Sequence, residues 1–195
     1  MPAGAGLEML GKKVYMLSDD PVPSRYLTLP GASRIVKWCP HAVDLAIAVD
    51  CGSKEMLGSV FSVFQCANNI LEIDHHHCRI PFGDYSIVDT QVSSAGELVY
   101  TLLNDLDIPI TENIAWNILT SIIVETNSFR LPDLNPRTFE ICAELLKTGI
   151  DFSKLTETVY WRTSKASAIL NGIALYQCKF SKNGELAWVI LTKKD

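Results

Sequence analysis

Two short apolar runs that each end in an aspartate constrain the fold of this chain more than any other feature. The run Leu45–Val49 stops at Asp50, and the run Ile70–Ile73 stops at Asp74. A short continuous apolar run that is closed by turn residues is typical of a buried strand. Chemistry in open α/β sheets gathers just beyond the carboxyl ends of such strands. We therefore expect both aspartates to border a functional cleft.

Helical segments with recognisable ends alternate with these runs. Ser94–Glu97 has the sequence of a capping box, in which a serine side chain and a glutamate carboxylate satisfy each other's backbone donors. Asn135-Pro136 is typical of a helix start. The alternation predicts an α/β fold with a mainly parallel sheet flanked by helices. At the end of the chain, Asn183-Gly184 between two apolar segments predicts a β-hairpin, which we expect to begin a second domain.

Three of the four histidines in the chain, His75 to His77, follow Asp74 directly. A carboxylate and imidazoles at one strand end suit a hard or borderline divalent cation. Together with Asp50 and with Glu125, which follows a predicted helix, they are the donor types that a two-metal phosphoryl-transfer centre requires. The alternative is a polar loop whose histidines are simply hydrated.

Composition narrows the classes of partner. The net charge is −5 and the basic residues are scattered, whereas a protein that tracks a nucleic-acid backbone carries a basic stripe. We therefore expect no groove for duplex DNA. No apolar run approaches the roughly 18 residues of a membrane-spanning helix. The N-terminus lacks the pattern of a signal peptide, so we expect a cytoplasmic protein without a membrane partner.

The order of several motifs resembles that of the DHH phosphoesterases. The motif Asp74-His75-His76 lies within EIDHHH, and VDCGS surrounds Asp50. FGDYSIVD, SSAGELVY, ETNSFRLP and NPRTFEICAELL then follow in the family's order. The branch that looks most similar is the bacterial oligoribonuclease and 3′-phosphoadenosine-5′-phosphate phosphatase group, which is related to the RecJ exonucleases. The resemblance implies a metal-dependent hydrolase of short single-stranded RNA or small nucleotide phosphates.

The resemblance also implies a set of metal ligands. Asp50 would bridge two Mn²⁺ ions, with Mg²⁺ as the alternative metal. His75 would bind one of these ions, and Glu125 would supply a further ligand. The family normally has aspartate at the last position, so the longer glutamate arm would move this carboxylate by about one methylene.

Catalytic and substrate-binding roles follow from the same resemblance. His76 would contact the phosphate or the attacking water, and Asp74 would orient its neighbours from behind, as partners of ligating imidazoles do. Ser93, Ser94 and Arg130 fall in family-like motifs near the cleft and are candidates for substrate binding.

The chain departs from the family at both ends. The family begins with a strand that ends in a histidine and two aspartates, and its C-terminal domain carries a glycine-rich loop with a histidine; neither motif occurs here. We expect residues 1–150 to form an N-terminally incomplete DHH domain, 151–178 a helical linker region, and 179–195 the start of a truncated substrate-binding domain. Apolar sheet edges left without the first strand predict self-association into homo-oligomers.

Three functions remain open from the sequence. The first is a phosphoesterase that activates water with two metal ions. The second is a catalytically incomplete DHH fragment, or a module that binds a nucleotide or a partner without turnover. The third is a relative that hydrolyses pyrophosphate, which the SSAGELVY and ETNSFRLP segments favour less.

Overall fold

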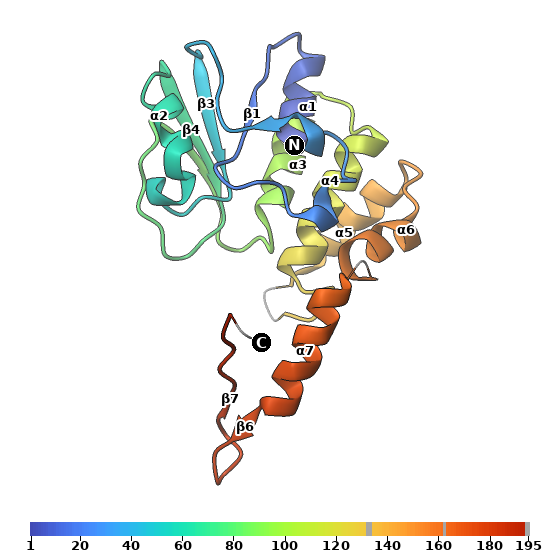
Figure 1. Cartoon of the computed structure of the whole chain (residues 1–195). Helices are drawn as coiled ribbons and strands as arrows, with labels where there is room; N and C mark the ends of the chain where they lie inside the picture. Colours follow the sequence, from blue (N-terminus) through green and yellow to red (C-terminus); the bar gives the residue numbers. More distant parts are fainter. Residues whose placement is uncertain (132–133, 162, 194–195) are drawn as a thin grey trace. The chain divides into compact units, whose positions relative to one another are not determined.

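The computed structural model describes residues 1–131, 134–161 and 163–193 (Figure 1). The chain divides into two compact units, Met1–Val159 and Tyr160–Asp195. The domain boundaries expected near residues 150 and 178 stay predictions, and residues 194–195 of the expected C-terminal domain lie outside the described part. Within that part, no helix has both the length and the apolar character that crossing a membrane requires.

The first unit contains a parallel sheet of three strands. The strands β3 (Leu45–Val49), β4 (Asn69–Asp74) and β5 (Tyr85–Val88) follow one another in that order, and both pairings are parallel. In this register Val49 pairs with Ile73, so Asp50 and Asp74 lie at the same end of the sheet, where the strands have their carboxyl ends. The expected parallel α/β architecture is confirmed.

A second, smaller parallel pair precedes this sheet. It joins β1 (Met16–Leu17) to β2 (Ile35–Val36). The residues Lys12–Leu17 have the composition of a longer strand, but only the last two of them form one. The second strand of the pair has too few residues for any periodic signal in the sequence.

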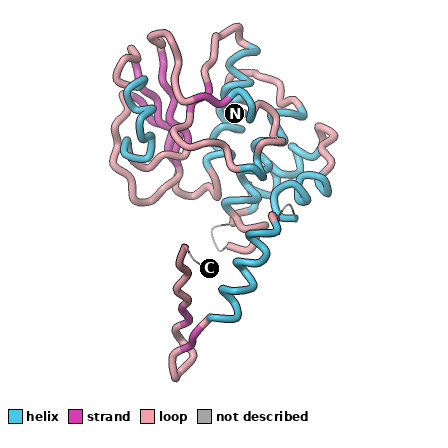
Figure 2. Tube along the Cα trace, viewed as in Figure 1, coloured by secondary structure: helices cyan, strands magenta, loops and turns pink. Residues whose placement is uncertain are grey.

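Helices, short helical turns and the loops between them make up the rest of the first unit (Figure 2). The buried centre is α4, whose side chains at Ile114, Ile118, Leu119 and Ile122 are at most 1% exposed. The helices α1, α3 and α5 pack against it, so α4 holds the helical layer together. The helical elements of this unit are α1 (Pro2–Met9), η1 (Ser24–Tyr26), η2 (Ala32–Arg34), η3 (Lys54–Val60), α2 (Phe61–Phe64), α3 (Ala95–Asp105), α4 (Glu112–Glu125), α5 (Pro136–Leu146), α6 (Phe152–Thr156) and η4, a π-helical turn (Glu157–Trp161).

The start of α3 corrects the capping-box prediction. Ser94 has the extended backbone of an N-cap, but its side chain accepts no capping hydrogen bond. The Glu97 carboxylate instead accepts hydrogen bonds from the backbone N–H of Ser93 (3.0 Å) and from the Ser93 hydroxyl. Thr138 on α5 donates to the same carboxylate oxygen, at 3.1 Å. The glutamate is 1% exposed, so it draws its donors from two elements and ties the start of α3 to α5.

The described residues of the second unit include one helix and one hairpin. The helix α7 (Lys165–Gln177) begins at Ser164, whose hydroxyl accepts from the backbone N–H of Ser167 at 3.0 Å. The strands β6 (Lys179–Phe180) and β7 (Ala187–Trp188) then pair antiparallel. Gly184 lies in the turn with a φ of 72°, so the predicted hairpin is confirmed.

Candidate functional site

Asp50 and His75, two of the expected metal ligands, lie close together at the carboxyl ends of the strands. Asp50 follows β3, and His75 follows β4. Asp50 directly follows β3 with a φ of 61°, and its N–H donates to the carbonyl of Ile73 on β4 at 2.8 Å. Its Oδ1 atom lies 3.4 Å from Nε2 of His75. Both atoms are buried, and neither has a hydrogen-bond partner in the described part of the chain. Because Nδ1 of His75 faces the carbonyl of Val92 at 3.4 Å, it carries the proton of the neutral ring and leaves Nε2 toward Asp50.

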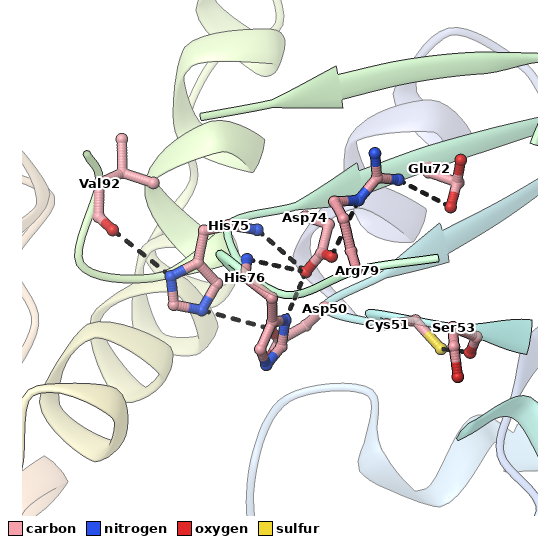
Figure 3. Close-up of polar contacts among 9 residues, drawn as sticks. All are labelled: Asp50, Cys51, Ser53, Glu72, Asp74, His75, His76, Arg79 and Val92. Atoms are coloured by element: carbon pink, nitrogen blue, oxygen red, sulfur yellow. Dashed lines mark hydrogen bonds and ion pairs between the residues drawn. The ribbon is translucent and has the colours of Figure 1, made fainter. Parts of the chain in front are cut away.

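The neighbouring histidine is held by Asp74. Nδ1 of His76 lies 2.7 Å from Oδ1 of Asp74 and 3.8 Å from Oδ1 of Asp50 (Figure 3). The same oxygen of Asp74 accepts the backbone N–H of His75 at 2.9 Å. Asp74 is fully buried, and it contacts the ring of His76 and the backbone of His75. The orienting role that the resemblance implied for Asp74 stays a prediction.

Arg79 forms a buried ion pair next to Asp74, and the sequence analysis did not predict this pair. Nη2 of Arg79 is 2.8 Å from Oε1 of Glu72, and its Nε is 3.4 Å from Oδ2 of Asp74 (Figure 3). The other oxygen of Glu72 accepts the N–H of Gly83 at 3.0 Å. The signal in the sequence was Glu72 itself, since a charge inside an apolar strand needs a partner.

A cavity of about 240 Å³ opens beside the histidines. Of the site residues expected from the sequence, His75, His76, Ser93 and Glu125 line it. The full lining is His75, His76, His77, Thr90, Val92, Ser93, Glu125, Thr126, Leu131 and Leu134.

The candidate substrate residues are placed differently from one another. The hydroxyl of Ser93 faces Glu97 and Thr138, so it is already engaged. The hydroxyl of Ser94 is buried without a partner in the described part of the chain. Arg130 is exposed, and it is not among the residues that line the cavity.

Glu125 is the last residue of α4, and an unusual turn follows it. Asn127, Ser128 and Phe129 have φ values of 46°, 60° and 62°, which is the left-handed region that non-glycine residues seldom occupy. Thr126 holds this turn, because its hydroxyl donates to the carbonyl of Ile122 at 2.6 Å and accepts the N–H of Phe129 at 3.0 Å.

The charges of the site shift the pKa values of its own groups. The Asp50 carboxylate raises the pKa of His75 above its usual value, against the opposing effect of burial. Burial and the charge of Asp50 raise the pKa of Glu125. Burial opposes a low pKa at Asp74, but the hydrogen bond and charge of His76 and the backbone donors outweigh it and lower that pKa. The charge of Asp50 therefore raises the pKa of both Glu125 and His75.

The donor set fits a divalent cation. One ligand atom from each of Asp50, His75 and His76 can be chosen so that all lie within 4.8 Å of one another. Imidazole nitrogens and carboxylate oxygens bind small divalent ions at about 2.0–2.2 Å, so two ligands of one ion stand about 3–3.5 Å apart. The unpartnered atoms of Asp50 and His75 are 3.4 Å apart, which matches that spacing.

Comparison with known proteins identifies similar sequences. No family model matches the chain. Over 157 residues it is 28% identical to the bifunctional oligoribonuclease and PAP phosphatase NrnA of Thermus thermophilus, an alignment that covers 80% of this chain and 47% of that protein. Over 127 residues it is 32% identical to the probable bifunctional oligoribonuclease and PAP phosphatase NrnA of Streptococcus mutans, covering 65% of this chain and 40% of that one. The names of these relatives support the resemblance to the DHH phosphoesterases that the sequence motifs indicate. It spans about half the length of the curated relatives that it matches.

A solved structure has the same fold as this chain. An exopolyphosphatase-related protein from Bacteroides fragilis superposes with a TM-score of 0.89 at 23% identity, covering 99% of this chain and 60% of that one.

Proposed function

We propose that this chain carries the metal-binding core of a phosphoesterase that hydrolyses short oligoribonucleotides or small nucleotide phosphates. The observation that carries the proposal is the pair of buried, unpartnered atoms on Asp50 and His75, 3.4 Å apart beside a cavity. The substrate class rests on the relatives, which are named as bifunctional oligoribonucleases and PAP phosphatases.

The cation ligands in this proposal are Asp50 and His75, and Glu125 reaches the same cavity. A bound divalent ion would supply Lewis acidity at a phosphoryl oxygen and lower the pKa of a water molecule. Mn²⁺ remains the expected metal, with Mg²⁺ as the alternative. The donor cluster of Asp50, His75 and His76 accounts for one ion, and the second ion of the expected pair stays a prediction.

His76 serves the phosphate in this proposal. Its Nδ1 donates to Asp74, so Nε2 is free of that bond and is the atom that can contact a phosphate oxygen or exchange a proton with it. Asp74 keeps the ring in this tautomer and balances the charge when the ring is protonated. The candidates Ser93, Ser94 and Arg130 are assigned to the surroundings of the cavity, because none of them offers a free side-chain donor within it.

A module that binds a nucleotide without turnover is the second candidate. It is favoured by a specific observation, namely that the described donors form one cluster with three members rather than the larger set that two ions need. Binding stoichiometry separates the two functions. Two tightly bound ions per chain support the enzyme, whereas one weak ion or none supports the binding module.

The deciding experiment is hydrolysis of a short RNA and of 3′-phosphoadenosine-5′-phosphate by this chain with Mn²⁺. Asp50→Asn is the test variant, and Asp20→Asn, at an exposed aspartate outside the site, is the matched control. We expect turnover in the unchanged chain and in the control, and loss of turnover in Asp50→Asn. If the unchanged chain gives no more turnover than Asp50→Asn, the chain is not a complete enzyme and the binding module takes its place.

A further inference from the structure

The loop that carries the histidines is an unusually short connection between parallel neighbours. The strand β4 ends at Asp74 and β5 begins at Tyr85, so residues 75–84 make the whole return, without a helix. Parallel strands are normally joined by a dozen residues or more, usually through a helix. Two backbone hydrogen bonds hold the return against the sheet, from Ile80 to the carbonyl of Gly52 (2.8 Å) and from Asp84 to that of Ile70 (2.9 Å).

The side chain of Arg79 attaches this loop to the buried carboxylates of β4. It is 15% exposed, and it bridges two carboxylates of β4 whose side chains are each 1% exposed. Glu72 and Asp74 stand two residues apart, so they lie on the same face of the strand. Two buried like charges so close would repel each other, and the one guanidinium between them relieves that repulsion.

The ion pair with Arg79 occupies one oxygen of Asp74 and leaves the other for hydrogen bonds with the histidines. Nε of Arg79 contacts Oδ2 (3.4 Å), whereas Oδ1 receives Nδ1 of His76 (2.7 Å) and the N–H of His75. The ion pair on one side and the hydrogen bonds on the other restrain the orientation of the Asp74 carboxylate, which in turn contacts the His76 ring.

We propose that Arg79 is a positioning residue of the metal site: through Asp74 it holds His76 in the tautomer that presents Nε2 rather than Nδ1 for binding. Its relevance to catalysis rests on the function proposed above, whereas its effect on the ring is a property of the metal-free chain.

The first test needs no metal. Nitrogen-15 NMR of the imidazole rings in the metal-free protein distinguishes the two tautomers. We expect His76 to carry its proton on Nδ1 in the unchanged chain and to populate both tautomers in Arg79→Gln. Arg34→Gln is the matched control, because Arg34 also pairs with a glutamate, Glu8, but outside the site. It should leave the His76 signals unchanged.

The second test measures Mn²⁺ affinity by calorimetry. Because Nδ1 of His76 lies 3.8 Å from the ligand oxygen of Asp50, a misplaced His76 ring disturbs the cation site. Residues that position the ligands of a metal typically contribute 10- to 100-fold to its affinity, so we expect Arg79→Gln to weaken Mn²⁺ binding by about that factor. Arg79→Lys keeps the charge but not the fork that spans both carboxylates, and it should fall between the two. If Arg79 acts through Asp74, then Arg79→Gln added to Asp74→Asn should cause no further loss.

The outcomes separate this proposal from the proposed function. An unaltered His76 tautomer in folded Arg79→Gln, or full and additive losses in the double variant, overturns the role of Arg79. Should Arg79→Gln fail to fold cooperatively by circular dichroism, Arg79→Lys takes its place in both tests, with a partial shift in tautomer as the expected result and none as the overturning one. A shifted tautomer in a chain that binds no Mn²⁺ supports the positioning role and removes the metal-dependent function.

Discussion

The hydroxyl of Thr126 accepts the backbone N–H of Phe129 at 3.0 Å and so closes the left-handed turn behind Glu125. We predict that Thr126→Val lowers the free energy of unfolding by about 1–3 kcal/mol, because a buried N–H loses its partner. Thr120→Val is the matched control, since Thr120 on the same helix likewise donates to the carbonyl four residues earlier. Urea denaturation should show the larger loss for Thr126→Val; equal losses would mean that the turn does not depend on this acceptor.

A second prediction separates the two serines before α3. Ser93→Ala removes a hydroxyl that donates to the buried Glu97 carboxylate, and we expect a loss of about 1.5–3 kcal/mol, the usual range for hydrogen bonds to charged groups. Ser94→Ala removes a buried hydroxyl that has no partner in the described part of the chain, so we expect no loss. Thermal and urea unfolding of both variants check the order. A larger loss for Ser94→Ala would restore the capping box inferred from the sequence.

The raised pKa of His75 predicts how stability depends on pH in the metal-free protein. A histidine whose pKa is higher in the folded chain adds stability that is fully present below about pH 6.5 and is lost as the pH rises through the folded pKa. We therefore expect the difference in unfolding free energy between the unchanged chain and His75→Gln to shrink as the pH rises above 6.5. Denaturation at a series of pH values, with a chelator present, gives this difference. A constant difference would contradict the assigned cause.

Metal binding should reverse that trend. A cation requires the neutral imidazole, so binding releases the proton that Asp50 favours. We predict that Mn²⁺ affinity rises with pH through the folded pKa of His75, with proton release measured by calorimetry in buffers of different ionisation enthalpy. His77→Gln, at an exposed histidine of the same loop, is the control and should keep the same pH profile.

Glu125 should affect stability and binding in opposite directions. Its pKa is raised by burial and by Asp50, so the charged form costs stability above that pKa and the cost disappears as the pH falls. We expect Glu125→Gln to raise the metal-free melting temperature at pH 8 and to weaken Mn²⁺ binding. Differential scanning fluorimetry with and without Mn²⁺ measures both effects. A variant that binds Mn²⁺ as tightly as the unchanged chain would remove Glu125 from the ligand set.

The sequence predicted those parts of the fold whose signal is local. The strand β3 is a continuous apolar run, and β4 is apolar apart from Glu72 and its two ends. The start of α5 has Asn135 accepting from Thr138, with Pro136 next, as such motifs predict. The strand β2 escaped prediction because it has two residues and exists only through its pairing with β1.

The candidate site was predictable for a related reason. Asp50 and His75 are brought together because the parallel register puts the ends of β3 and β4 side by side. Arg79 was not predictable, since its partner Glu72 lies seven positions earlier, at a distance that only the course of the loop determines. The hydrogen bond from Thr138 to Glu97 was not predictable either, because the two residues lie on different helices that only the packing of the fold brings together.

The short return from β4 to β5 links the assembly of the site to that of the sheet. The same ten residues that present the histidines are the covalent connection that allows β5 to pair with β4. An ion bound at the site would therefore stabilise the folded chain by mass action. We expect the β4–β5 pairing to be among the parts of the sheet that this stabilisation protects most. Amide exchange in β5 would then report metal occupancy, although no residue of that strand is a metal ligand in this proposal.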